Sequence, residues 1–357
     1  METSLNIVLN KVLMAAAKEK ASNIHLAVGA YPALRIDDEL VELREEKVIT
    51  EDMMESLVGD WLDEGQKKEL EDNKEIVFVK EVGKQFRLKV NFFFQKNFLS
   101  ASFRPMPSNI PPLINLGLPK SVYNLTEKKS GLIIISGPYG SGRTTTLASM
   151  LNEINKTRKE SIVTVEQPIE YVITNSKSLV EQREVGRDVN SFSDAIEYAQ
   201  DSDVDVLAVS ASQEPAALPL ILEFANSGRL AFVVMETTSV TQSIEEILAR
   251  FSMDDKDRAQ QLVSEGLLAV ISQRLVPRRG GGLVLAAEVL IVNEAASSLI
   301  REGRVKQIKT IIQSSRAEGM SSLDQSLAEL VKSGEVLIDQ ALEHADDPHS
   351  LRAKARS

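Results

Sequence analysis

The chain has 357 residues, the size of two domains, with no cysteine and only three histidines. The lack of cysteine excludes disulfides, thiolate zinc sites and cysteine nucleophiles. Because the histidines are His25, His344 and His349, the long stretch between them cannot supply a histidine base or a histidine-pair zinc site. The net charge of −11 argues against broad non-specific nucleic-acid binding, so we expect no nucleic-acid partner.

The first twenty residues predict an amphipathic helix and not a signal peptide. Apolar residues recur there at helical spacing between polar and charged ones, at Leu5, Val8, Leu9, Val12 and Leu13. No apolar run approaches the ~20 residues that cross a bilayer. We therefore expect a cytoplasmic protein with no direct membrane insertion, which reaches a membrane only through a partner.

Residues 1–104 predict a small domain that mixes helices and strands. The run Ile76–Val79 and the alternating stretch Phe86–Phe92 are typical of strands. Prolines then cluster at positions 105, 107, 111, 112 and 119. Because proline fixes φ and removes a backbone donor, residues 105–125 predict a stiff, extended linker that marks a domain boundary.

Residues 126–292 predict an α/β domain with a mostly parallel sheet, since apolar β-rich runs alternate there with helical stretches. The expected strands are Leu132–Ile135, Ile162–Val165, Val204–Val209, Leu230–Val234, Leu268–Ile271 and, after a Pro-Arg-Arg-Gly-Gly-Gly turn, Leu283–Ile291. Residues 293–343 have a helical pattern. The polar tail, 344–357, is expected to be flexible.

A glycine-rich segment between a strand and a helix predicts a phosphate-binding loop. It reads Gly137-Pro-Tyr-Gly140-Ser141-Gly142-Arg143-Thr144-Thr145. Its glycines let successive backbone N–H groups face one concavity, the helix N-terminus adds its dipole, and the Thr144 hydroxyl can reach Mg²⁺. A glycine-rich turn without a ligand is the alternative. The expected cofactors are ATP and Mg²⁺.

Arg143 stands where this motif requires lysine. Lysine places a compact ammonium at the β- and γ-phosphates, whereas arginine is a wide planar fork, so the exchange is not conservative at a tight site. We expect nucleotide binding to be weakened and hydrolysis to suffer more.

The sequence resembles the type IV pilus retraction motors, the PilT-like, twitching-motility branch of the secretion ATPases. The resemblance covers nearly the whole chain and is carried by Ala21–Leu26 with Leu34–Asp37, Phe103–Ser108, Gln182–Asp188, Val270–Leu275 and Gly319–Gln325. It implies a RecA-like P-loop NTPase core, a smaller N-terminal α+β PAS-like domain and a C-terminal helical part. It also implies a hexameric ring that couples ATP hydrolysis to pilus retraction through an inner-membrane platform protein.

The sequence departs from that family where the chemistry is done. The strand that begins near Asp205 continues with Ser210-Ala211 where the family has Gly-Glu, so the carboxylate that would polarise the attacking water is missing. Two family histidines fall at Arg229 and Glu236. Losing a water-orienting base costs ~10²–10⁴ in rate, and losing a phosphate-contacting arginine can cost ~10³–10⁵. We expect hydrolysis to be weak or absent.

Neighbouring carboxylates offer a compensating alternative. Glu166, Glu170 or Glu214 could replace the missing group, and Glu166 is the best retained catalytic candidate because it ends a strand that should face the phosphate loop. Asp205 is a candidate magnesium ligand with Thr144, or only a residue that begins a strand.

Three basic residues of the N-terminal domain are further candidates. Arg87 and Arg104 match family arginines and Lys89 stands where the family has arginine, so the resemblance implies that they contact nucleotide phosphates. An exposed strand face with alternating charge explains Arg87 and Lys89 equally well.

Three functions remain open. The first is a nucleotide-binding relative of the motor with little or no hydrolysis, acting as a regulatory or accessory subunit. The second is an active hexameric retraction ATPase with substitute catalytic residues. The third is an interaction module that binds no nucleotide. The sequence does not distinguish a homomeric ring from a mixed ring with an active paralogue.

Overall fold

The computed structural model describes residues 4–36, 39–83, 86–106 and 109–356, and it divides into two compact units, 1–109 and 110–357. Met1, Asp37, Pro107 and Ser108, which belong to segments interpreted above, lie outside the described residues. Each unit has its own hydrophobic core.

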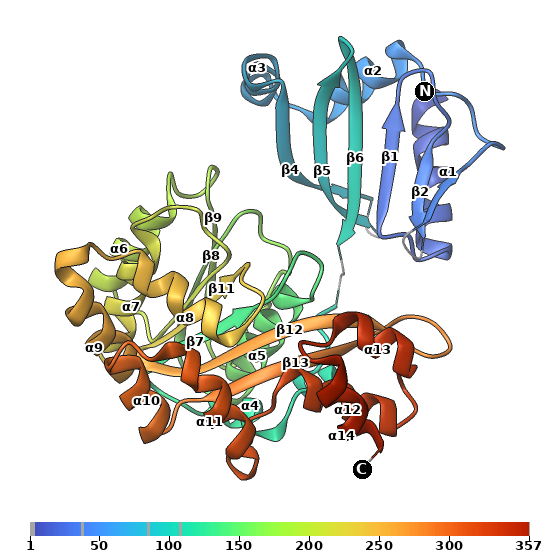
Figure 1. Ribbon diagram of the computed structural model, residues 1–357. Coiled ribbons are helices and arrows are strands. Elements are labelled where there is room, and N and C mark those ends of the chain that lie inside the picture. The colour runs from blue at the N-terminus through green and yellow to red at the C-terminus, as the bar shows by residue number, and fades with distance from the viewer. Residues whose placement is uncertain (1–3, 37–38, 84–85, 107–108, 357) are drawn as a thin grey trace. The chain divides into compact units, whose positions relative to one another are not determined.

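The first unit is an antiparallel sheet with helices on one face (Figure 1). Its strand order is β3-β2-β1-β6-β5-β4, with bounds β1 Asn23–Ala27, β2 Ala33–Ile36, β3 Glu39–Glu42, β4 Glu75–Val82, β5 Phe86–Gln95 and β6 Phe98–Met106. The helices are α1 (Ser4–Lys18), α2 (Glu51–Trp61) and α3 (Glu64–Asn73). The two strands and the first helix predicted for this unit are confirmed.

The core of this unit follows from simple patterns. Along β5, every second side chain is buried, namely Leu88, Val90 and Phe92, as alternation in a half-buried strand requires. They share one buried cluster with the apolar stripe of α1, and the rings of Phe92 and of Trp61, at the end of α2, lie tilted at 53° with centroids 6.1 Å apart.

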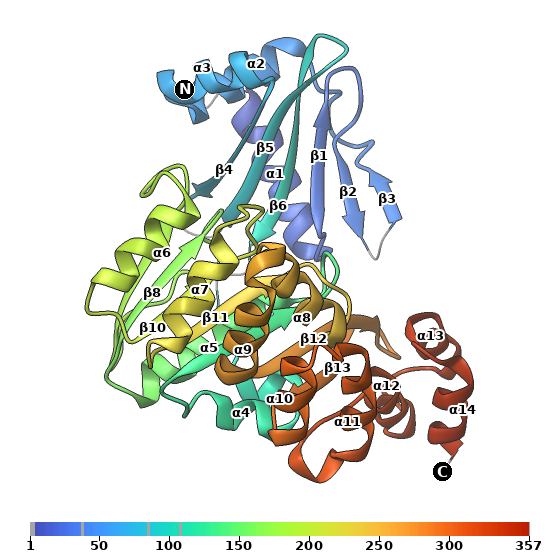
Figure 2. The ribbon, with the colours of Figure 1, turned by 60° about the vertical axis from the view of Figure 1, so that its left-hand side comes forward.

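The second unit is built on a seven-stranded sheet in the order β13-β12-β7-β11-β10-β8-β9, parallel except for β13 (Figure 2). The strands are β7 Gly131–Ser136, β8 Ser161–Glu166, β9 Leu179–Glu184, β10 Val206–Val209, β11 Leu230–Met235, β12 Leu267–Pro277 and β13 Leu283–Ile291. All six strands predicted here are present. The edge strand β9 was not predicted.

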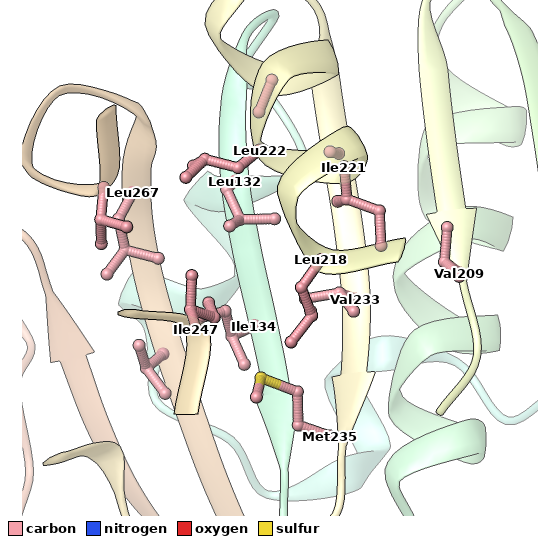
Figure 3. Close-up of a cluster of buried hydrophobic side chains, with 14 of the residues drawn as sticks. Leu132, Ile134, Val209, Leu218, Ile221, Leu222, Val233, Met235, Ile247 and Leu267 are labelled. Atoms are coloured by element: carbon pink, nitrogen blue, oxygen red, sulfur yellow. The ribbon is translucent and has the colours of Figure 1, made fainter. Parts of the chain in front are cut away.

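Helices cover both faces of this sheet, as buried strands on both sides require. One face packs on α4 (Lys120–Leu125) and α5 (Arg143–Thr157). The other packs on α6 (Phe192–Asp201), α7 (Ala217–Asn226), α8 (Val240–Ala249), α9 (Lys256–Gly266), α10 (Glu294–Arg301) and α11 (Ile308–Ser314). Figure 3 shows Leu218 and Ile221 of α7 above Leu132 and Ile134 of β7.

The predicted extended linker, 105–125, is wrong over its second half. Residues 113–116 form a 3₁₀ turn and α4 follows it. Leu113, Leu118, Val122 and Leu125 are buried against the sheet, so this segment is part of the second unit's core. Proline at the first positions of short helices is compatible with this structure, because the missing donor is not needed there.

The prediction of a flexible tail over 344–357 is also wrong. Pro348–Arg356 forms α14, which packs beside α12 (Leu323–Lys332) and α13 (Ile338–His344). Leu351 is fully buried in this cluster. A single large apolar residue among polar ones gives a weak signal in the sequence. In the structure, Leu351 holds α14 in place by packing against apolar residues of α12 and α13.

Candidate functional site

The glycine-rich loop joins β7 to α5 at the carboxyl edge of the parallel sheet. Gly137, Gly140 and Gly142 have φ of 154°, 78° and 85°, a region that favours glycine. A Cβ at Gly137 would lie 2.3 Å from the carbonyl oxygen of Gln273 and 2.4 Å from Oγ of Ser141. The loop therefore depends on glycine at its first position for space as well as for φ.

Gln273, in the middle of β12, fixes the loop from the side. Its fully buried amide donates from Nε2 to the Ser141 carbonyl at 2.8 Å, and its Oε1 accepts from the Thr146 hydroxyl at 3.0 Å. Sequence reasoning gave Gln273 no role. The available signal was a polar residue inside an apolar strand, since a buried amide needs partners.

The buried Ser141 Oγ has no hydrogen-bond partner among the described residues. The hydroxyl lies against Gly137, inside the loop. A buried polar group without a partner calls for an explanation, and an absent ligand or water that it would contact is one. The open hydroxyl is consistent with a loop that binds a polar ligand.

Helix α5 begins at Arg143, and its first amides have no partner within the helix. Thr144 and Thr145 are half-buried in this first turn. The Thr145 hydroxyl is engaged by the Tyr171 hydroxyl at 2.9 Å. Thr144 lines a small cavity together with Glu166, Tyr171 and Gln182, and its contact with Mg²⁺ stays a prediction.

The Arg143 side chain is held by the neighbouring strand β11. Its Nη1 donates to the Met235 carbonyl at 2.7 Å, and its Nη2 contacts Oε1 of Glu236 at 3.2 Å. The arginine side chain is only 10% exposed. Two positions at which the sequence departs from the pilus-motor pattern, Arg143 and Glu236, are therefore paired with each other.

Glu166 ends β8 at the same carboxyl edge and is buried. Burial raises the pKa of its carboxyl, although hydrogen bonds from Thr164, Gln182 and the Glu170 backbone act in the opposite direction. The Thr164 hydroxyl lies 2.7 Å and the Gln182 amide 3.1 Å from Oε1. A raised pKa suits a proton acceptor or donor near neutral pH, so Glu166 stays a catalytic candidate.

The end of β10 carries no carboxylate toward this edge. A cavity of about 190 Å³ lies there, and Ala211, Gln213, Met235, Glu236 and Gln242 are among its lining residues. The small side chain of Ala211 thus borders a hollow where the resemblance places a glutamate.

Glu214, a considered substitute for that glutamate, is engaged elsewhere. Its two oxygens accept from the backbone N–H groups of Phe192 and Ser193, at 2.8 and 2.9 Å, and from the Ser193 hydroxyl. Burial acts to raise the pKa of Glu214, but these bonds outweigh it and lower the pKa. The residue caps α6, as carboxylates at helix N-termini do.

The assignment of Asp205 to magnesium is wrong. Asp205 precedes β10, and β10, β11 and β7 are parallel neighbours, so Asp205 lies at the amino edge and the phosphate loop at the carboxyl edge. Its Oδ2 accepts from the Ser161 backbone N–H at 2.8 Å. The other reading of Asp205, a residue that begins a strand, is the one the structure supports.

The donor set fits magnesium only in part, through the Thr144 hydroxyl. Within the described ranges, no cluster of three or more histidine, aspartate or glutamate side chains is arranged to hold a metal ion.

The three basic candidates of the first unit lie on one face of its sheet. Lys89 and Arg104 are directly opposite each other on β5 and β6, and Arg87 is two residues from Lys89. Their neighbours Leu88 and Val90 point to the core. The structure brings the three together, and their contact with phosphate stays a prediction.

The family assignment rests on a match along almost the full length. Residues 2–343 match the family described as "Type II/IV secretion system protein". The chain belongs to this family. Within the part of the chain that the structure describes, no helix has both the length and the apolar character needed to span a bilayer.

Individual members of this family are similar to the chain over most of both lengths. The chain is 34% identical to the type IV pilus retraction ATPase PilT of Pseudomonas aeruginosa, over 96% of this chain and 99% of the relative. It is 30% identical to the type IV pilus ATPase PilU of the same organism, over 96% and 90%. The crystal structure of the pilus retraction motor PilT with bound ADP matches with a TM-score of 0.88 at 36% identity, over 99% and 100% of the two chains. The expected resemblance and fold class are confirmed.

Proposed function

We propose that this secretion-system family member binds nucleotide at its phosphate loop, hydrolyses ATP weakly or not at all, and acts as a regulatory or accessory subunit in pilus retraction. The assignment to retraction is supported by the PilT and PilU relatives, which are named as pilus ATPases. The reduced hydrolysis is supported by the residues around the loop.

One observation carries this proposal: the frame of the loop is intact, while its cation is diverted. The positive-φ glycines and the Gln273 brace keep the shape that holds phosphate. Arg143, in contrast, is bonded to Met235 and Glu236. Phosphoryl transfer depends on charge placed at the transferring group, so the diverted cation and Ala211 together remove much of what drives hydrolysis.

The test is Mg²⁺-dependent ATP binding and turnover on the purified full chain, with the oligomer mass measured alongside. We expect saturable binding of a fluorescent ATP analogue and a turnover at least ~10³-fold below that of an active motor. Turnover comparable to an active motor, in protein free of contaminating ATPase, contradicts the proposal. Absence of saturable binding favours the interaction module that binds no nucleotide.

A second candidate, an active retraction ATPase with substitute residues, is favoured by the position of Glu166. This carboxyl lines the same small cavity as Thr144, and burial raises its pKa, as a general base requires. If it replaces the missing glutamate, Glu166→Gln abolishes a measurable turnover. An unchanged turnover excludes that role.

For the assembly, we propose a ring, hexameric by the resemblance, that is either homomeric or mixed with an active paralogue. The ring would act at the inner membrane through the pilus platform protein, with Arg87, Lys89 and Arg104 as phosphate-contacting residues. Mass measurement of the chain alone and with an active paralogue distinguishes the two ring types.

A further inference from the structure

The carboxylate of Glu236 stands next to the one cation that the phosphate loop itself contains. Glu236 follows β11, whose last residue, Met235, pairs with Ser136 at the end of β7. The carboxylate is therefore beside the start of the loop. Its Oε1 lies 3.2 Å from Nη2 of Arg143, and the glutamate side chain is 55% exposed. One end of the pair is thus buried and the other faces solvent at the carboxyl edge.

Two parts of a phosphate loop serve different phosphates. The backbone N–H groups cradle the α- and β-phosphates, and the cation at the position of Arg143 reaches the β- and γ-phosphates. In this chain the backbone part keeps its positive-φ glycines and its brace from Gln273. The cation is already neutralised by a carboxylate and fixed by the Met235 carbonyl.

The hollow beside Glu236 adds no compensating positive charge. Its charged lining residues are Glu236, Glu246 and Arg250. Arg250 is paired with Glu246, with Nη2 and Oε1 2.6 Å apart. The charges on this side of the loop are therefore closed into two ion pairs, and the lining of this hollow offers no further cation for an additional phosphate group.

We propose that this phosphate loop selects a nucleoside diphosphate over a nucleoside triphosphate, with Glu236 as the residue that determines the selectivity. The inference rests on the proposed nucleotide binding and deepens it by naming the ligand class. Glu236 is ion-paired with Arg143, the cation that a γ-phosphate requires, and its carboxylate stands close to where that phosphate would bind. The diphosphate, in contrast, can bind through the backbone N–H groups of the loop.

The experiment is a competition titration of the full chain, in which unlabelled ADP and a non-hydrolysable ATP analogue displace a fluorescent ADP. We expect wild type to bind ADP at least about tenfold more tightly than the triphosphate analogue. Glu236→Gln, which keeps an acceptor for Arg143 and removes the charge, should bring the two affinities within about threefold by strengthening the triphosphate alone. Thermal melting checks that the variant is folded.

A matched control and a second variant complete the test. Glu329→Gln, on α12, removes a carboxylate that lies 2.6 Å from the guanidinium of Arg316, and it should change neither affinity. Arg143→Ala leaves Glu236 uncompensated, so it should weaken binding of the triphosphate analogue more than binding of ADP and widen the ratio of the two affinities beyond that of wild type. It keeps the inference testable if Glu236→Gln does not fold.

The outcomes separate this inference from the function beneath it. Equal affinities of wild type for ADP and the triphosphate analogue overturn the selectivity while nucleotide binding stands. An equal shift of both affinities in Glu236→Gln overturns the role of Glu236. Failure of the chain to bind either nucleotide overturns the proposed function, and the selectivity with it.

Discussion

Polar groups lie at both edges of the seven-stranded sheet, but the groups at the two edges differ in what they bind. At the amino edge, polar side chains bond to backbone groups around them: Asp205 accepts from Ser161, and Arg229 donates to the Ala199 carbonyl and lies over the Phe224 ring. At the carboxyl edge, the amides at the start of α5 and the Ser141 hydroxyl remain available. The polar groups named at the amino edge are therefore engaged in structure, whereas those named at the carboxyl edge are open to a ligand.

The largest effect should come from breaking the loop frame at the carboxyl edge. Gly137→Ala introduces a Cβ that would meet the Gln273 carbonyl and Ser141 at distances real side chains do not reach. We expect nucleotide affinity to fall by roughly 100-fold or more, because the donors that hold phosphate move together.

Fluorescent-ADP titration measures this loss, and Gly281→Ala is its control. Gly281 also has positive φ, at 103°, but a Cβ there meets nothing within 4 Å. Unchanged affinity in Gly137→Ala would show that the loop does not bind nucleotide through its backbone.

A smaller effect is expected from the brace of the loop. Gln273→Ala removes two buried hydrogen bonds and leaves the Ser141 carbonyl and the Thr146 hydroxyl without their partner. Unfolding free energy should fall by about 2–4 kcal/mol, since each buried polar group left unsatisfied costs about 1–3 kcal/mol. Nucleotide affinity should fall by about tenfold because the loop loses its support. Urea unfolding and ADP titration on one preparation measure both, and a loss of stability with unchanged affinity would make the brace purely structural.

The amino edge should respond in stability alone. Arg229→Ala removes the bonds to Ala199 and Ser227 and the stacking over Phe224, where the guanidinium lies 4.0 Å from the ring centroid. The expected loss is about 1–2 kcal/mol of unfolding free energy, with nucleotide affinity within about twofold of wild type. A tenfold drop in nucleotide affinity in Arg229→Ala would contradict the view that residues at the amino edge act only in stability.

The sequence predicted the second sheet well because its central strands are continuous apolar runs. It missed β9, where Leu179–Glu184 lies at the sheet's edge and carries mostly polar, half-exposed side chains. The prediction for the tail was wrong for a similar reason, since Leu351 is the one large apolar residue of α14 and Ala355 packs beside the same cluster. Long apolar runs identify buried strands, whereas edge elements depend on contacts that no local pattern contains.

The candidate site was predicted less completely than the fold. The sequence indicates that Glu166 ends a strand facing the phosphate loop, but Asp205, proposed as a magnesium ligand beside Thr144, precedes β10 and lies at the opposite edge. The Arg143–Glu236 pair joins residues 93 positions apart, which meet because β7 and β11 are neighbours. That adjacency follows from the strand order, which the spacing of motifs does not give.

The smallest expected effect is on the pH dependence of stability. It comes from Glu288, a buried carboxyl on β13 that is bonded to the start of α8. Burial raises the pKa of Glu288 above its ordinary 4.5, against an opposing hydrogen bond from the Val240 backbone; Asp346 adds to the rise, and Lys309 and Arg274 oppose it. The folded chain thus holds this proton more tightly than the unfolded chain does. Its contribution to stability is complete below pH 4.5 and is lost as pH rises through the folded pKa.

Glu288→Gln should remove that part of the pH dependence and narrow the difference in melting temperature between pH 4.5 and pH 7. Melting curves of wild type and variant across this range measure it, with Glu245→Gln, an exposed carboxylate, as the control. Identical pH profiles of wild type and Glu288→Gln would contradict the shift.

The pairing of Arg143 with Glu236 also bears on how easily this chain could regain an ordinary phosphate loop. Restoring lysine at 143 alone leaves an ammonium beside the same carboxylate, which would capture it. Restoring a neutral residue at 236 alone leaves the guanidinium bonded to the Met235 carbonyl. A neutral residue at 236 removes the competing carboxylate, and lysine at 143 also removes the guanidinium bond to Met235, so an ordinary phosphate loop requires both changes together. The effect of a substitution at either position therefore depends on the residue at the other.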